Sequence, residues 1–138
     1  MKSMIKDPSL AADGQLKIEW AKNHMPVLNL FSERYSKEKP FAGTHINICL
    51  HIEAKTACLA LALREMGAEV ALAGCNPLST QDDVAAALVE RGVGVFGIHG
   101  ADDELYNECI TRSLENEPEL IIDDGGDLVH ILHTEKEP

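Results

Sequence analysis

Two kinds of segment alternate four times between residues 44 and 133: short runs rich in β-branched and aliphatic residues, and longer runs with helical spacing of apolar side chains. The expected strands are THINICL at 44–50, AEVALAG at 68–74, VGVFGI at 93–98 and PELIID at 118–123. The expected helices are EAKTACLALALREMG at 53–67, STQDDVAAALVERG at 79–92, ADDELYNECITRSLENE at 101–117 and GDLVHILH at 126–133. Because such alternation favours parallel strands joined by right-handed crossovers, it predicts an α/β fold, a Rossmann-like open parallel sheet with helices on both faces.

Residues 1–40 precede this pattern and are expected to form a helical lead-in that is broken at Pro26. Leu16, Trp20 and His24 are spaced four apart and are expected to share one face of the first helix. A chain of 138 residues is short enough to be one domain, so the lead-in and the alternating part at 44–133 are expected to form a single unit.

Residue types at the expected element ends give finer predictions. Gly67 is expected to end the helix at 53–67, and Ser79 or Thr80 to cap the helix at 79–92. Most aromatic residues precede residue 42, so the core of the later part is expected to be aliphatic.

The charge distribution excludes two classes of partner. The net charge is −11, and the last 38 residues hold twelve acidic side chains against two basic ones. Phosphate backbones and anionic membranes attract positive charge, so neither a nucleic acid nor a membrane is an expected partner. The four cysteines form no CxxC pair, and no apolar run reaches membrane length, which predicts a cytoplasmic protein with reduced thiols.

Polar residues follow each of the four expected strands. In chain order they are His51 and Glu53, Cys75 and Asn76, His99, and Asp123, Asp124 and Asp127. Ligands of open α/β sheets bind outside the carboxyl ends of the strands, where these loops converge. A carboxylate at the end of an apolar strand is costly unless it is hydrogen-bonded, paired or used, so the sequence predicts a polar site at this edge.

Several motifs have two interpretations. GVGVFG at 92–97 matches the dinucleotide pattern GxGxxG, but it coincides with an expected strand instead of following one, which favours Gly92 as a helix end. HILH at 130–133 could supply half of a metal site, although a structural or partly exposed histidine pair is the preferred interpretation. DDGGD at 123–127 could hold Mg²⁺ in a phosphoryl-transfer domain, and Cys75 could be a nucleophile instead of a packed thiol.

Three blocks together resemble one known family. CLHIEAKTACL at 49–59, GCNPLSTQDDVAAAL at 74–88 and IIDDGGDLVHILH at 121–133 are similar, in sequence and in spacing, to S-adenosylhomocysteine hydrolase. The resemblance runs from about residue 7 to residue 133 and covers only the N-terminal, substrate-binding portion of that family.

The resemblance implies an activity and the residues that carry it. The family splits S-adenosylhomocysteine into adenosine and homocysteine after tightly bound NAD has oxidised the ribose. The histidine of the CLH motif corresponds to His51, which would assist proton transfer near C5′. The second aspartate of DDGGD corresponds to Asp124, which would contact the ribose and take part in proton abstraction. Asp127 would support that loop, and Ser79 and Gln81 would line the same crevice.

The purine would be read by the first block, where the sequence departs from the common pattern. Many family members have threonine and glutamate where this chain has Glu53 and Lys55, and Thr56 follows in the same turn. A carboxylate and an ammonium reverse the pattern of donors and acceptors, which predicts a modified purine such as hypoxanthine as the base.

A second departure concerns the cofactor. In the family a second Rossmann domain with the NAD fingerprint follows, whereas this sequence ends at TEKEP. The chain alone is therefore expected to bind no NAD and to be incapable of the redox step.

It would be part of an S-adenosylhomocysteine hydrolase, completed by a separate NAD-domain chain or detached from a longer protein. The alternatives are a stand-alone ligand-binding or assembly module and the Mg²⁺-dependent phosphoryl-transfer domain. Surfaces that would face a second domain predict a homo-oligomer.

Overall fold

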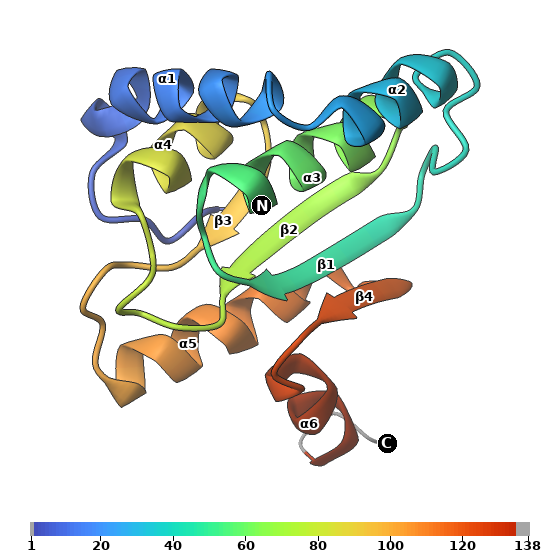
Figure 1. Ribbon diagram of the computed structural model, residues 1–138. Coiled ribbons are helices and arrows are strands. Elements are labelled where there is room, and N and C mark those ends of the chain that lie inside the picture. Colours follow the sequence, from blue (N-terminus) through green and yellow to red (C-terminus); the bar gives the residue numbers. More distant parts are fainter. Residues whose placement is uncertain (1, 135–138) are drawn as a thin grey trace.

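The computed structural model describes residues 2–134 and shows a four-stranded, fully parallel sheet between layers of helices (Figure 1). The strands are β1 (His45–Leu50), β2 (Glu69–Gly74), β3 (Gly94–Phe96) and β4 (Leu120–Asp123), in the spatial order β3-β2-β1-β4. The helices are α1 (Ala11–Lys22), α2 (Pro26–Tyr35), α3 (Ala54–Glu65), α4 (Asp82–Glu90), α5 (Asp103–Ser113) and α6 (Asp127–Thr134), with 3₁₀ turns η1 (Pro8–Leu10) and η2 (Leu114–Asn116). This is the predicted α/β architecture, including the helical N-terminal segment.

Side chains that alternate along β1 separate the interior into two cores. Ile46 and Ile48 belong to the core beneath α3 and α4, where Ile18 of α1 also packs. Cys49 belongs to the core beneath α5 and α6, with Phe96 of β3. Because both faces of the sheet are covered, the strands read as nearly continuous apolar runs. The prediction of an aliphatic core in the later part of the chain is wrong, because the ring of Phe96 is fully buried in that core.

The N-terminal helices form an outer layer above α3 and α4 (Figure 1). Helix α1 approaches α4 closely at Gly14, where an added Cβ would lie 2.0 Å from the carbonyl oxygen of Asp83. Lys17 also forms a 2.6 Å ion pair with Asp83. The opposite side of α1 faces outward: Leu16 and Trp20 are each 67% exposed, and the Trp20 ring stacks on His24.

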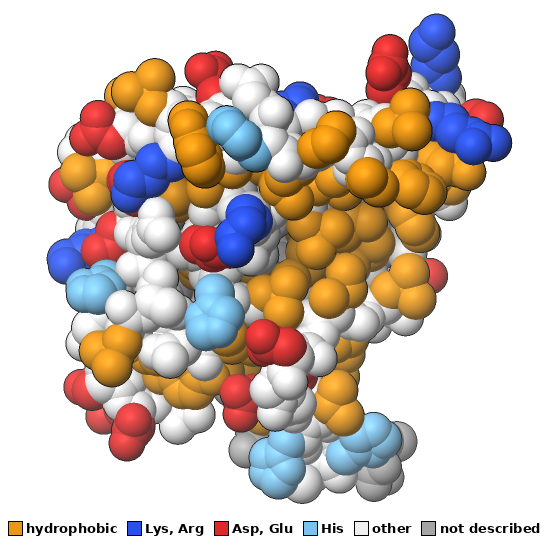
Figure 2. Space-filling view, in the orientation of Figure 1, with side chains coloured by type: hydrophobic (Ala, Val, Ile, Leu, Met, Phe, Trp, Pro, Cys, Tyr) orange, Lys and Arg blue, Asp and Glu red, His pale blue; other side chains and the backbone are white. Residues whose placement is uncertain are grey.

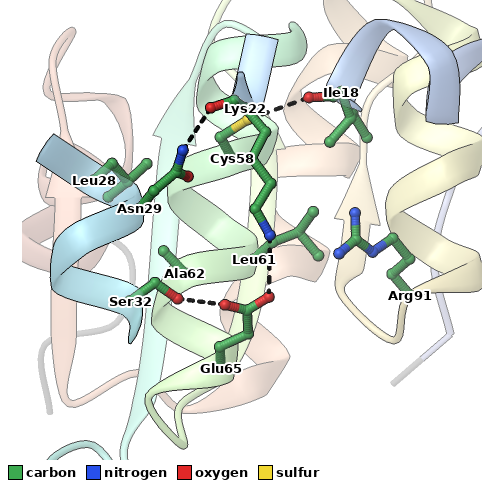
Figure 3. Close-up of a pocket in the computed structure, with 10 residues that line it drawn as sticks. All are labelled: Ile18, Lys22, Leu28, Asn29, Ser32, Cys58, Leu61, Ala62, Glu65 and Arg91. Carbon is green, nitrogen blue, oxygen red and sulfur yellow. Dashed lines mark hydrogen bonds and ion pairs between the residues drawn. The ribbon is translucent and has the colours of Figure 1, made fainter. Parts of the chain in front are cut away.

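A group of polar contacts holds α2 against α1 and α3 (Figure 3). Ser32 of α2 donates a hydrogen bond to Glu65 of α3, whose other oxygen pairs with Lys22 of α1 at 3.9 Å. Asn29 of α2 donates to the carbonyl oxygen of Lys22 at 2.7 Å. The cavity between these side chains holds about 20 Å³, room for roughly one water molecule, and residues of the strand ends are not among those that line it. This group of polar contacts is therefore structural.

Element ends differ from the predictions in two places. The helix after β2 begins at Asp82 with Gln81 as its N-cap, and no side chain caps it. The hydroxyls of Ser79 and Thr80 instead donate to the carbonyl oxygen of Asn76, so the predicted cap is wrong. The lead-in also contains an extended residue before its helices, because Met4 forms a parallel bridge to Phe96 beside β3.

Other predicted ends are confirmed. Gly67 follows α3 with a φ of +102°, and Gly92 follows α4 with a φ of +81°, a region that glycine enters without strain. GVGVFG therefore contains a helix end and β3, as its position predicted. Within residues 2–134, no helix is both long and apolar enough to cross a membrane.

Candidate functional site

The order of the strands reverses direction between β1 and β4. From β1 the chain crosses to β2 and then β3 on one side, and β4 returns to the other side of β1. In open α/β sheets, the carboxyl ends of the two strands at such a switch point border the ligand crevice. Cys49 pairs with Asp123 in the register of β1 and β4, so His51 and Asp124 follow the two strands at nearly the same level.

Three side chains from three different loops meet at this edge. One ring nitrogen of His51, the Sγ atom of Cys75 and one carboxylate oxygen of Asp124 all lie within 4.8 Å of one another. His51 follows β1, Cys75 follows β2 and Asp124 follows β4. The structure thus brings together His51, Cys75 and Asp124, which the strand-end argument placed at this edge, while the sequence left the role of Cys75 between a packed thiol and a nucleophile.

Ser79 lies beside the His51 ring. The Nδ1 atom of His51 lies 2.6 Å from Ser79 Oγ, and the same hydroxyl lies 3.0 Å from the carbonyl oxygen of Asn76. When the hydroxyl donates its proton to Asn76 O, its oxygen accepts from Nδ1–H of His51. In the neutral ring the lone pair then lies on Nε2, the nitrogen available for a proton, a ligand or a metal.

The loop that carries Asp124 is held by its neighbour Asp123. The carboxylate of Asp123 accepts hydrogen bonds from the backbone N–H groups of Gly126, Leu128 and Val129, at 2.9, 3.0 and 3.3 Å. A carboxylate at the first turn of α6 also lies at the positive end of the helix dipole. Asp123 is therefore structural, which opposes a Mg²⁺ site that would need its oxygens, while Asp124 remains exposed.

Tyr106 of α5 links two of the three loops, and the sequence reasoning missed it. Its hydroxyl lies 2.9 Å from a carboxylate oxygen of Asp127 and 3.1 Å from the carbonyl oxygen of Cys75. Burial, with the hydrogen bond to Asp127 and its charge, raises the pKa of Tyr106 above its usual value, so the phenol stays protonated and acts as a donor. Its position on a helix, four residues after the capping Asp102, gave no strand-end signal.

Cys75 is a protonated thiol at neutral pH. Burial, followed by the negative charge of Asp124, raises the pKa of Cys75 to about 11. The thiol is half-buried and lies beside the Asp124 carboxylate, so the environment does not stabilise a thiolate. The arrangement opposes Cys75 as a nucleophile.

The residues assigned to the purine lie at the start of α3. Glu53 occupies the N-cap position, and its carboxylate pairs with Lys55 Nζ at 3.5 Å. Thr56 is half-buried in the same turn. They adjoin His51 in the chain, and the Glu53 carboxylate is not among the atoms of His51, Cys75 and Asp124 that lie within 4.8 Å of one another.

Other polar candidates lie elsewhere. The side chain of Gln81 accepts from Lys17 at 3.2 Å. His99 contacts Thr80 O through Nδ1 at 3.1 Å and is outside the cluster. His130 and His133 are both exposed on α6.

The described residues do not fit a dinucleotide. The loop from β1 to α3 contains His51, Ile52 and Glu53 where a fingerprint would place glycines, and the Glu53 carboxylate lies where the pyrophosphate would meet the helix N-terminus. The glycines after β4 are flanked by Asp124 and Asp127.

The sequence of this chain is similar to sequences of one known family. The family description S-adenosyl-L-homocysteine hydrolase matches residues 2–138. The S-inosyl-L-homocysteine hydrolase of Methanococcus maripaludis is 53% identical over 97% of this chain and 32% of its own length. The same-named enzyme of Methanocaldococcus jannaschii is 52% identical over 96% of this chain and 32% of its own. The adenosylhomocysteinase of Aquifex aeolicus is 52% identical over 95% of this chain and 32% of its own. The chain spans about a third of the length of these relatives. With residues 2–138 matched, the chain belongs to the S-adenosyl-L-homocysteine hydrolase family.

Proposed function

We propose that this chain is the substrate-binding portion of a hydrolase that splits a purine nucleoside–homocysteine thioether. The observation that carries the proposal is the meeting of His51 and Asp124 at the β1–β4 switch point. Relatives with about 50% identity are named as hydrolases of such thioethers. Membership of the family and the position of the two side chains are independent reasons for the same site.

In this proposal His51 moves a proton at the carbon–sulfur bond. The imidazolium form donates a proton to the departing sulfur, and the neutral ring that results, with its lone pair on Nε2, then accepts a proton from the attacking water. Ser79 keeps the ring in that orientation through the 2.6 Å hydrogen bond to Nδ1. The carboxylate of Asp124 is an acceptor for ribose hydroxyls and for a proton from the sugar, while Asp127 and Tyr106 support its loop.

A test of these roles requires the rest of the family's architecture. The purified chain is mixed with the remaining two-thirds of the Methanocaldococcus jannaschii relative, NAD and S-inosylhomocysteine, and release of homocysteine is measured. We expect turnover only in the mixture, and a loss of about 10²-fold or more for His51→Gln, the usual scale of general acid–base catalysis. The matched control His130→Gln changes an exposed histidine of α6 and retains activity. Equal activity of the His51→Gln and His130→Gln mixtures would contradict the assignment.

We further propose that Glu53 and Lys55 read the base, and that the base is hypoxanthine. Hypoxanthine offers an acceptor at O6 and a donor at N1–H, which match an ammonium and a carboxylate. The names of two of the relatives specify S-inosyl-L-homocysteine, and that of the Aquifex relative specifies the adenosyl compound. Binding of inosine and adenosine to the chain, compared by calorimetry, tests this. We expect tighter binding of inosine and a reduced preference in Lys55→Gln, whereas a strong preference for adenosine would refute it.

A broad apolar surface supports docking of the remaining two-thirds of the enzyme. A groove of about 460 Å³ is lined by Leu28, Phe31, Tyr35, Pro40, Phe41, Leu63 and Met66. Figure 2 shows hydrophobic side chains continuing from this region of α2 and α3 down over β1 and β4. Among the described residues, β4 is paired only with β1, so its outer edge offers backbone groups to another strand.

On its own, a chain with this surface is expected to associate with a second copy. Light scattering after size exclusion is expected to show a dimer or larger species, weakened by Phe31→Glu in the groove. Leu16→Glu on the outer side of α1 is the matched control, since Leu16 is also exposed but lies outside the groove. A clean monomer at all concentrations would contradict self-association.

A stand-alone ligand-binding module is the second candidate, because residues 2–134 by themselves bring His51, Cys75 and Asp124 together at the sheet edge. The two are separated by the mixing experiment: nucleoside binding without turnover in any mixture supports the module. The four cysteines are free thiols, which supports a reducing compartment such as the cytoplasm for either candidate.

A further inference from the structure

The side chains that meet at the switch point are an imidazole, a thiol and a carboxylate, and each is a metal ligand. Each comes from a different loop, after β1, β2 and β4, so the parallel sheet itself brings them together. We propose that His51, Cys75 and Asp124 bind a thiophilic divalent cation such as Zn²⁺ in the space that the proposed function assigns to the ribose.

The donor set selects the kind of cation. A thiolate and an imidazole suit Zn²⁺, whereas Mg²⁺ and Ca²⁺ take oxygen ligands almost exclusively. Zinc binds sulfur at about 2.3 Å and nitrogen or oxygen at about 2.0–2.2 Å, so tetrahedral ligand atoms are roughly 3.3–3.7 Å apart. The three ligand atoms lie within 4.8 Å of one another, so a movement of about an ångström brings them to the separations of a zinc site. His51 and Asp124 are exposed and can rotate, and Cys75 is half-buried.

The surroundings of the cluster also suit a metal. A histidine that binds zinc through one nitrogen donates the other N–H to an acceptor, which fixes the ring. Ser79 Oγ, 2.6 Å from Nδ1 of His51, is placed to accept that N–H, and its hydroxyl lies 3.0 Å from Asn76 O. The three hydrogen bonds to Asp123 hold the backbone of the loop that carries Asp124, so a small rotation of its side chain is enough to reach the ion.

Binding is a ligand exchange that balances without a further reactant. The cation gives up water molecules, and Cys75 loses its proton to solvent as the metal–sulfur bond forms. Three protein ligands leave one tetrahedral position for water. The net charge of −11 attracts a cation to the chain. Because the ion would occupy the position of the ribose, the ion and a nucleoside exclude each other. This exclusion rests on the proposed function.

Metal binding is tested directly on the purified chain. Zn²⁺ is titrated by calorimetry, and Co²⁺ is substituted so that a thiolate-to-cobalt absorption band reports coordination by sulfur. We expect one ion per chain, loss of the band in Cys75→Ser, and Zn²⁺ affinity at least about tenfold weaker in His51→Gln. His130→Gln is the matched control and is expected to bind as the unchanged chain does. Circular dichroism checks that each variant is folded.

The absence of binding, a band that survives Cys75→Ser, or an equal loss in His130→Gln would overturn the metal site. Titration of inosine with and without Zn²⁺ tests the exclusion separately. Inosine affinity that falls in proportion to Zn²⁺ occupancy supports it, and inosine affinity that Zn²⁺ leaves unchanged overturns it. If Zn²⁺ binds and inosine binds under no condition, the metal site stands while the exclusion and the proposed function both fail.

Discussion

At the scale of single residues, the state of His51 depends on its hydrogen bond to Ser79. An isolated neutral imidazole prefers the proton on Nε2, whereas donation from Nδ1–H to Ser79 Oγ, 2.6 Å away, would place it on Nδ1. We expect ¹⁵N chemical shifts of the His51 ring to report protonated Nδ1 in the unchanged chain and a shift toward protonated Nε2 in Ser79→Ala. His99, whose Nδ1 contacts Thr80 O, is the internal control and keeps its shifts. Identical His51 shifts in the two proteins would show that Ser79 does not orient the ring.

Cys75 gives a prediction for pH dependence. Its pKa is raised to about 11, first by burial and then by the negative charge of Asp124, so the reactive thiolate is scarce below that pH. Replacing Asp124 by Asn removes a negative charge and lowers the pKa. Alkylation of Cys75 at pH 8 is then expected to accelerate, about tenfold for each unit by which the pKa falls. Asp103→Asn, at an exposed position of α5, is expected to leave the rate unchanged.

Mass spectrometry after timed alkylation separates Cys75 from the other thiols. Cys49, Cys58 and Cys109 are buried and are expected to react more slowly. A rate at Cys75 that does not respond to Asp124→Asn would mean that the two groups are not neighbours in solution.

The residues of the site were predictable to different degrees. His51 and Asp124 follow apolar strands directly, and the rule for strand ends predicts that such residues converge. The roles within DDGGD were not predictable, because only the folded loop shows that Asp123 binds three N–H groups while Asp124 stays exposed. Tyr106 was missed since contacts between a helix and a distant loop leave no local pattern. The base-reading roles of Glu53, Lys55 and Thr56 stay predictions.

At the scale of elements, the packing of α1 on α4 depends on Gly14. Alanine would raise helix propensity by up to about 1 kcal/mol, but its Cβ would lie 2.0 Å from Asp83 O, a backbone atom. Overpacking of this kind costs about 1–3 kcal/mol, and relief here requires a movement of a whole helix. We therefore expect Gly14→Ala to lower the free energy of unfolding by about 1–2 kcal/mol, measured by urea denaturation.

Leu16→Ala is the control for that measurement, because Leu16 is exposed on the same helix. It is expected to change the free energy of unfolding by no more than about 0.5 kcal/mol. An unchanged or higher stability of Gly14→Ala would show that α1 does not pack on α4 as described.

The order and type of the elements were predictable from the sequence, and their capping was not. Alternation of strand and helix, with glycines such as Gly67 and Gly92 at helix ends, predicted every strand and helix between residues 44 and 133. The cap at Ser79 or Thr80 was wrong because both hydroxyls are used by Asn76 O in the turn before α4. Local propensity favours several hydrogen bonds for such residues, and the tertiary structure selects among them.

At the scale of the whole molecule, the two edges of the sheet differ in their backbone pairing. Met4 pairs with Phe96 beside β3, whereas β4 has no partner on its outer side among residues 2–134. The apolar surface of Figure 2 reaches the same open edge. The relatives are about three times longer than this chain, and the site at the β1–β4 switch point lies beside the edge where their remaining parts would dock. The site and the docking surface are therefore expected to act together.

The central claim is that the loops after β1, β2 and β4 form one nucleoside site. We would measure it by titrating inosine into the ¹⁵N-labelled chain and following backbone amide shifts up to the solubility of the ligand. We expect saturable shifts of the His51, Cys75 and Asp124 amides with a single dissociation constant. These shifts are abolished together by His51→Gln and are retained in His130→Gln. Saturable shifts confined to other surfaces, or no saturable shift at all, would contradict it.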